Sequence, residues 1–310
     1  MSPKLHTDIM VNILEQLDNE YGTLHSCLFL DRQICRIAVQ VLWRRPFELL
    51  RDKAWIAYPH LISVYLSCLS DSDKITLAAH KIFPFISIAP LFDYPSYLED
   101  LDDSFVYYAI SVWFQNTAGF NYQDTVQVTW LSLMRTFAQR CTHLRRLHLE
   151  LSLYHPSAMA ADILSLISQH QRSLNSFTVE FTICDPESMK NNARLIANVI
   201  SVQKTGLKEF EVWQGDVDID KIIAALETQL HSLVKISFGF CSFNTYPLLS
   251  WVGHFAYMKE LMFDRCFNVR DGDFEILEAF MTKVVHHQRI TFLTNDKQHA
   301  SETDVYERKR

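Results

Sequence analysis

A short apolar unit that recurs five times in the second half of the chain constrains the fold more than any other feature. In each unit, apolar residues occupy the first, fourth and sixth positions, and the units begin at Leu144, Leu174, Leu207, Leu233 and Met258. The alternation that ends each unit is typical of a β-strand with one buried face. A sixth unit is predicted at 290–292, and amphipathic helical patterns occupy 158–169, 188–202, 219–230 and 274–285.

Strands and helices that alternate at intervals of 25 to 33 residues are typical of leucine-rich repeats, in which stacked units share one continuous core. We therefore predict an α/β fold class that ends in a short leucine-rich-repeat-like solenoid. The alternative is an ordinary α/β domain, which produces a similar alternation. The predicted repeats are degenerate, because the turn position that usually holds Asn or Cys is Ser152, Thr182, Gly215, Cys241 and Cys266 in the successive units. We expect Cys241 and Cys266 to be core residues.

The first 47 residues contain more apolar side chains than a unit of that size can bury. Three short helices are predicted: the first has Thr7 as N-cap, the second has Thr23 as N-cap, and the third runs from Asp31 to Leu42 before Pro46. Ile9, Ile13 and Leu17 recur four residues apart and make one apolar face. The surplus apolar surface must dock on the following domain or on another protein.

This stretch resembles an F-box, in the variant found in large fungal families of F-box proteins with leucine-rich-like repeats. The resemblance rests on the apolar positions of the first helix, on Leu24-His25-Ser26-Cys27-Leu28, on Cys35-Arg36-Ile37-Ala38 and on Leu42-Trp43-Arg44-Arg45-Pro46-Phe47. The sequence departs from the family pattern at His6, where proline is usual, and at Ile34, where tryptophan is usual. Both departures bear on the affinity for the adaptor.

The resemblance implies that the chain is a non-catalytic receptor subunit of an SCF-type ubiquitin ligase. It would bind a Skp1-like adaptor and the cullin ligase core at one end and a client protein at the other. The residues expected to bind the adaptor are Leu5, Ile9, Ile13, Leu14, Leu17, Leu28, Leu30 and Trp43. The alternative is an interaction scaffold whose F-box-like helices pack internally, and a third class is a cryptic hydrolase.

We predict four regions along the chain: an F-box at 1–47, a helical bridging region at 48–140, the degenerate repeats at 141–295 and a polar tail at 296–310. In the bridging region, helical patterns occupy 62–69, 75–79, 105–114 and 128–138. Prolines at 84, 90 and 95 break the intervening chain into loops.

Composition excludes several classes of function. The net charge of −7 argues against nucleic-acid binding, and the pairs Arg44-Arg45 and Arg145-Arg146 are expected to be solvated ends of helices or strands. The seven cysteines include no C-x-x-C pair, which favours free thiols in a reducing compartment over disulfides or a metal site. No signal peptide or membrane span is expected, so we predict a cytoplasmic or nuclear protein.

Catalytic motifs are also missing from the sequence. Only seven glycines occur, and there is no phosphate-binding glycine loop, nucleophile elbow or H-E-x-x-H pair. The adjacent His286 and His287 would point about 100° apart on a helix, so no metal site is expected there. We therefore predict no cofactor and no catalytic residue.

The residues between the buried strand positions are expected to share one face of the predicted repeats. On that face six acids stand against two bases, Arg146 and Lys235. We hypothesise that this face binds a client protein through a basic segment, with an aromatic anchor. The residues assigned to it are Glu150, Glu180, Glu209, Glu211, Trp213, Glu260 and Asp264. The alternative is that these are ordinary solvated positions.

Overall fold

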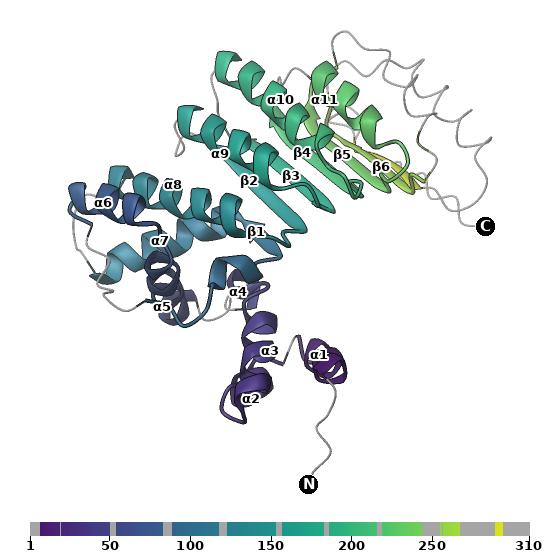
Figure 1. Cartoon of the computed structure of the whole chain (residues 1–310). Coiled ribbons are helices and arrows are strands. Elements are labelled where there is room, and N and C mark those ends of the chain that lie inside the picture. Colours follow the sequence, from purple (N-terminus) through teal and green to yellow (C-terminus); the bar gives the residue numbers. More distant parts are fainter. Residues whose placement is uncertain are drawn as a thin grey trace. The chain divides into compact units, whose positions relative to one another are not determined.

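The computed structural model describes residues 7–18, 20–49, 54–82, 89–117, 123–152, 157–182, 186–215, 219–243, 255, 257–266 and 289–293. The chain divides into two compact units, Met1–Leu144 and Arg145–Arg310 (Figure 1). The predicted helix at 274–285, the polar tail at 296–310 and the positions Leu5 and His6 lie outside the described residues.

The first unit begins with three helices, α1 (Thr7–Glu15), α2 (Tyr21–Cys27) and α3 (Arg32–Leu42) (Figure 1). Helix α3 starts where the Asp31 carboxylate accepts hydrogen bonds from the backbone N–H groups of Gln33 and Ile34, at 2.7 and 2.9 Å. The buried core that the three helices share is small, and it consists of Leu14, Leu24, Ile37, Ala38, Val41 and Leu42. A core of this size gives the three helices only a small free energy of unfolding.

The third helix ends at Leu42, before Pro46, as predicted, but one detail of the predicted helix ends is wrong. Helix α2 begins at Tyr21 with no side-chain cap, so Thr23 lies inside the helix and does not cap it. Pro46 opens the short helix α4 (Pro46–Leu49), because a proline fits the first turn, where its missing N–H is not needed.

The segment from Trp43 to Arg45 ties these helices to later parts of the same unit. The Trp43 ring packs on Tyr94 and Tyr65, with ring centroids 4.2 and 5.2 Å apart. The guanidinium of Arg44 lies 2.5 Å from the Glu15 carboxylate and 3.3 Å from that of Glu99. Arg45 pairs with Asp18 and Glu48. The expectation that Arg44 and Arg45 are solvated is therefore wrong: both are half-buried and hold ion pairs.

The rest of the first unit is mainly helical. Its elements are α5 (Ala54–Ser67), α6 (Asp71–Ala79), the 3₁₀ helix η2 (Tyr94–Tyr97), the short strand β1 (Asp100–Asp102), α7 (Asp103–Thr117) and α8 (Gln123–Arg140). Ser70 caps α6, since its hydroxyl accepts a hydrogen bond from the Asp73 N–H at 3.1 Å. The four helical patterns predicted in this region lie within or across α5 to α8.

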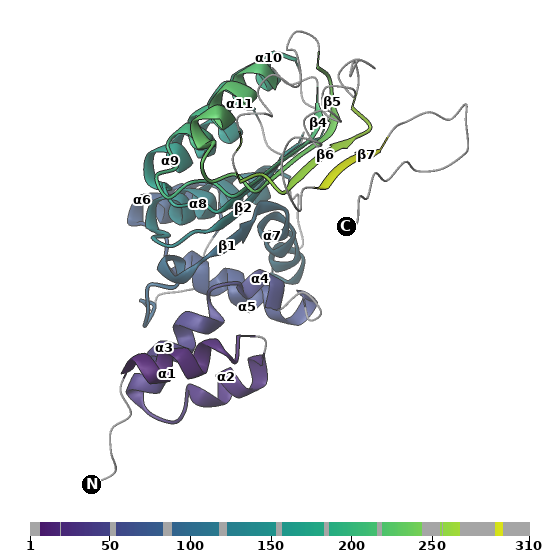
Figure 2. The ribbon, with the colours of Figure 1, turned by 90° about the vertical axis from the view of Figure 1, so that its right-hand side faces the viewer.

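The second unit contains six parallel strands in sequence order: β2 (Arg146–Ser152), β3 (Ser176–Thr182), β4 (Glu209–Gly215), β5 (Lys235–Cys241), β6 (Glu260–Asp264) and β7 (Arg289–Leu293). Between them lie α9 (Ser157–His170), α10 (Pro186–Ser201), α11 (Ile219–Leu226) and the 3₁₀ helix η3 (Glu227–Gln229). Helices α9, α10 and α11 lie side by side on one face of the sheet (Figures 1 and 2).

The core of this unit fills the space between the sheet and its helices. Two rows of apolar side chains run across the strands in register, from Leu147 to Phe177 to Phe210 and from Leu149 to Val179 to Val212. All are almost fully buried. Because strand side chains alternate, the same register places the intervening polar residues on the opposite face.

The predicted fold class, an F-box and helical bridge followed by a leucine-rich-repeat-like solenoid, is wrong. The structure is an α/β fold with six parallel strands, and the described residues contain eleven α-helices. The physical reason is that the repeated strand–helix pattern is compatible with more than one architecture. An apolar strand followed by an amphipathic helix satisfies both a stacked repeat and an ordinary parallel sheet, so the period alone does not separate them.

Candidate functional site

The candidate site lies on the face of the β2–β6 sheet opposite to α9–α11, which we call the open face. Among the described helices of this unit, none covers it (Figure 2). Three rows of residues cross the open face in strand register. The first row is Arg146, Ser176, Glu209, Lys235 and Glu260; the second is His148, Thr178, Glu211, Ser237 and Met262; the third is Glu150, Glu180, Trp213, Gly239 and Asp264.

All seven residues that the sequence assigned to client binding lie on the open face. Glu209 and Glu260 are exposed, whereas the other five are half-buried: Glu150, Glu180, Glu211, Trp213 and Asp264. The strand register therefore brings the predicted set together on one surface. That this surface binds a client stays a prediction.

The acids of the open face are not all equally available to a partner, because Lys235 offsets part of the charge of three of them. The Lys235 ammonium donates a hydrogen bond to the Glu211 carboxylate at 2.5 Å, and Glu209 and Glu260 flank Lys235 in register. Burial disfavours the charged ammonium, but the hydrogen bond and the three carboxylates outweigh it, so the pKa of Lys235 lies above its usual value. The acidic character that remains is concentrated in the third row.

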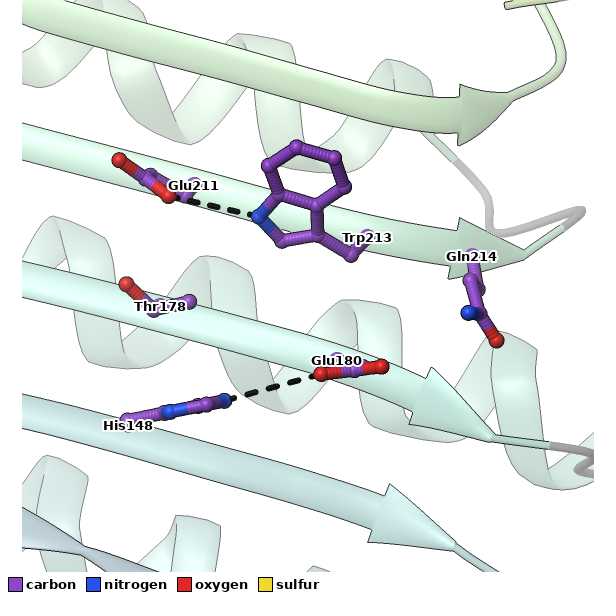
Figure 3. Close-up of a pocket in the computed structure, with 6 residues that line it drawn as sticks. All are labelled: His148, Thr178, Glu180, Glu211, Trp213 and Gln214. Carbon is purple, nitrogen blue, oxygen red and sulfur yellow. Dashed lines mark hydrogen bonds and ion pairs between the residues drawn. The ribbon is translucent and has the colours of Figure 1, made fainter. Parts of the chain in front are cut away.

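A pocket of about 370 Å³ opens on this face where the second and third rows meet (Figure 3). The residues that line it are His148, Thr178, Glu180, Glu211, Trp213 and Gln214. They come from β2, β3 and β4. The His148 imidazole lies 4.0 Å from the Glu180 carboxylate, and the two carboxylates of the pocket stand on adjacent strands. The pocket thus combines one aromatic face with two acids.

The indole of Trp213 is held in one orientation by two contacts. Its Nε1 donates a hydrogen bond to the Glu211 carboxylate at 3.3 Å. The ring also lies on the backbone of Gly239, where a Cβ atom would stand 2.1 Å from the ring carbon Cε3. Only glycine permits this close approach. The position of the Trp213 ring in the pocket wall therefore depends on Gly239, a residue of the neighbouring strand that has no side chain.

Replacing Gly239 with alanine is expected to displace the Trp213 ring from the pocket wall. The added methyl group overlaps the indole, and overpacking of this kind costs about 1–3 kcal/mol of the free energy of unfolding. Urea unfolding and the tryptophan emission spectrum measure the two effects. The control is Gly22→Ala in α2, where a Cβ meets nothing within 4 Å and where alanine stabilises a helix by roughly 0.5–1 kcal/mol. An unchanged emission spectrum in Gly239→Ala would contradict the described contact.

Sequence reasoning missed Gln214 as part of the pocket. Its backbone is in the left-handed region, with φ 57°, and Phe240 and Arg265 adopt the same conformation at φ 55° and 50°. Each of the three stands one residue before the predicted turn position of its unit, which is Gly215, Cys241 or Cys266. Their common position before the turn can be found from the sequence. The left-handed conformation cannot, because none of the three residues is a glycine, the residue type that usually adopts it.

The two cysteines at these turns are structural, as expected for Cys241, which is fully buried. The Cys241 thiol donates to the Gly239 carbonyl at 3.4 Å, and the Cys266 thiol donates to the Phe238 carbonyl at 3.3 Å. Cys266 is only half-buried, so the expectation of a core position is met less fully there. Within the described ranges, no group of three or more His, Cys, Asp or Glu residues is arranged to hold a metal ion.

The predicted adaptor-binding residues divide into two groups in the structure. Ile9, Ile13 and Leu30 are exposed by 48%, 50% and 67%. By contrast, Leu14 is buried in the core of the three helices, and three others are half-buried against that core: Leu17, Leu28 and Trp43. The structure thus leaves only part of the predicted set available to a partner.

An exposed aromatic row on α2 was not predicted. Tyr21, His25 and Phe29 stand four residues apart, with ring centroids separated by 6.1 and 5.5 Å. Phe29, just after the helix, is exposed by 77%. The spacing of four residues was visible in the sequence, but the apolar face of α2 was assigned from its leucines. These rings enlarge the exposed apolar surface beside Leu30.

No family model matches this chain, and no curated protein and no solved structure is significantly similar to it. A search of the described residues for a helix that is long and apolar enough to span a membrane finds none.

Proposed function

We propose that the chain is a non-catalytic receptor subunit of an SCF-type ubiquitin ligase. Its N-terminal helices would bind a Skp1-like adaptor, as the resemblance of residues 5–47 to an F-box implies, and through it the cullin ligase core. The open face would hold a client protein. The rate gain comes from a raised effective concentration of the client near a bound conjugating enzyme, so no catalytic side chain on this chain is needed.

The observation that carries the proposal is that apolar side chains remain exposed on the three N-terminal helices, although these helices already share a buried core. Exposed apolar side chains gather within residues 9–30, and they are Ile9, Ile13, Tyr21, Phe29 and Leu30. Single exposed apolar residues are common, but a group on so small a unit is typical of a protein interface. This favours a docking unit over a scaffold whose helices pack only internally.

A pull-down with recombinant Skp1 tests the proposal. The full chain is expected to retain Skp1, and the double variant Ile9→Asp and Ile13→Asp is expected to lose at least tenfold in affinity, because two carboxylates would enter an apolar contact. Both positions are exposed, so the variant keeps the helical core intact.

The matched control is Ile75→Asp on α6, where an isoleucine is exposed by 70% outside the N-terminal helices. It should bind Skp1 like the unaltered chain. If the unaltered chain does not bind Skp1, or if the double variant binds equally well, the scaffold becomes the better account of these helices.

A further inference from the structure

We propose that the pocket beside Trp213 binds the guanidinium group of an arginine in an extended basic segment of the client. The inference rests on the proposed function in that the segment belongs to the client protein. It goes beyond that function by naming the side chain that is recognised and the residues that recognise it. The pocket volume of about 370 Å³ lies within the range of about 300–1,000 Å³ typical of sites that bury small groups.

The third row places an aromatic residue and a carboxylate on adjacent strands, and both side chains line the pocket. Glu180 and Trp213 are register partners on β3 and β4, and adjacent strands are separated by about 4.8 Å. The Trp213 ring extends from β4 over Gly239 of β5, and Glu180 lies on the β3 side of the same pocket, so a planar cation bound there would have the indole on one side and the carboxylate on the other. Figure 3 shows both side chains bordering the same opening.

The two carboxylates of the pocket have different roles. Glu211 already accepts hydrogen bonds from Lys235 and from the Trp213 indole, so its task is to position the ring. Glu180 has the His148 imidazole as its neighbour at 4.0 Å, which is beyond hydrogen-bond length, and its side chain is 36% exposed. Glu180 is thus the carboxylate that an incoming cation reaches.

The pocket favours arginine over lysine. A guanidinium stacks on an aromatic face and donates in a fixed fork to a carboxylate, whereas an ammonium acts as a compact, strongly hydrated point charge. The Trp213 ring supplies the flat face, and Glu180 beside it supplies the acceptor. A neutral urea group of the same shape lacks the charge that both partners attract.

The surroundings of the pocket favour a chain segment over a free small molecule. The pocket is open to solvent, and the third row continues on both sides of it with acids, Glu150 on β2 and Asp264 on β6. An extended segment crossing the strands would meet a third-row acid on β2, β3 and β6. Charge complementarity therefore selects a segment with more than one basic residue.

Fluorescence anisotropy with the purified full chain tests the inference. The probe is a labelled peptide of alternating glycine and arginine, compared with peptides in which lysine or citrulline replaces arginine. We expect the arginine peptide to bind, the lysine peptide to bind several-fold more weakly, and the citrulline peptide to bind at least tenfold more weakly. Free arginine amide should compete only at much higher concentration than the peptide.

Variants separate the pocket from the general charge of the open face. Trp213→Ala and Glu180→Gln are each expected to weaken binding of the arginine peptide about fivefold, the first through loss of a solvent-exposed cation–π contact and the second through loss of a charge-assisted hydrogen bond. The comparison variant, Glu209→Gln, removes an acid of the same face that stands beside Lys235 in the first row and outside the pocket, and it should weaken binding clearly less than Glu180→Gln does.

Several results would overturn the inference: no binding of the arginine peptide, equal binding of the citrulline peptide, or equal losses in Glu209→Gln and Glu180→Gln. Tight binding of free arginine amide would overturn the assignment to a chain segment. The Skp1 pull-down remains a separate measurement. Peptide binding without Skp1 binding rejects the proposed function and leaves the pocket assignment standing, whereas the reverse result rejects the pocket assignment alone.

Discussion

Replacing Leu14 with aspartate is expected to unfold the three N-terminal helices, whereas the same substitution at the adjacent Ile13 leaves them folded. The two residues are neighbours on α1, yet Leu14 is only 5% exposed and Ile13 is 50% exposed. Loss of the buried leucine alone costs about 2–5 kcal/mol, and the carboxyl group placed in its site adds the cost of burying a polar group without a partner. The core of these helices contains so few buried residues that a loss of this size exceeds what it supplies.

Amide hydrogen exchange, read out on peptides from α1, α2 and α3, measures this difference. Leu14→Asp should remove protection from all three helices, because each contributes to the same core. Ile13→Asp should keep protection near that of the unaltered chain while it weakens Skp1 binding. Equal protection in the two variants would show that Leu14 is not the inward-facing residue of α1, and the division of the predicted adaptor-binding set would then be wrong.

This contrast also shows why the sequence did not separate the two residues. Ile9, Ile13 and Leu17 recur four apart, and Met10 and Leu14 lie beside them, so the apolar face of α1 is wide. A wide face contains both the stripe that packs on α3 and the stripe that remains outside. Which is which depends on the crossing of two helices, and that is a tertiary property that periodicity does not determine.

The β-strands were predictable for the opposite reason. Strict alternation fixes which residues share a face, and a shift by one residue would exchange the buried and exposed sets. The apolar rows through Phe177 and Phe210 and the open face through Glu180 and Trp213 both follow from alternation within each unit. The class of fold was predicted wrongly from the same pattern, because the stacking of strand–helix units has more than one architectural solution.

The candidate pocket depends on contacts across strands, which sequence patterns do not report. The Trp213 ring lies on Gly239, 26 residues further along the chain, and Glu211 accepts a hydrogen bond from Lys235. Counting charges on the predicted face gave six acids and two bases, which treats every carboxylate as free. In the structure, Lys235 stands beside the first-row acids and donates a hydrogen bond to Glu211, so the negative charge of the pocket that a partner can use lies at Glu180 on β3, two strands from Lys235.

A second large effect is expected from Gln203→Leu, which removes a buried polar bridge between successive strand–helix units. The Gln203 side chain is 6% exposed and makes three hydrogen bonds. Its carbonyl accepts from the Leu174 N–H at 2.9 Å, and its amide donates to the Gln171 and Val199 carbonyls at 3.1 and 2.7 Å. Gln229 repeats the arrangement one unit later, with its carbonyl accepting from the Leu207 N–H at 3.1 Å.

These glutamines satisfy backbone groups at the point where the chain leaves a helix and enters the next strand. Leucine matches glutamine in size but offers no donor or acceptor, so the variant leaves the Leu174 N–H and the Gln171 carbonyl buried without that partner. Each such group costs about 1–3 kcal/mol, which gives an expected loss of about 2–6 kcal/mol in the free energy of unfolding for the two groups. Urea unfolding followed by circular dichroism measures the loss as a lower midpoint at an unchanged slope.

Gln169→Leu is the matched control, because the same substitution on the exposed surface of α9 should change stability by no more than about 0.5 kcal/mol. A similar midpoint for Gln203→Leu and Gln169→Leu would mean that water or another group replaces the lost bonds, and the bridge would then have no role in holding the units together. If only Gln203→Leu lowers the urea midpoint, the sheet depends on polar contacts where each helix leads into the next strand. These contacts would then act together with the apolar rows. In that case the register that places Glu180 beside Trp213 is maintained partly by residues on the opposite side of the strands.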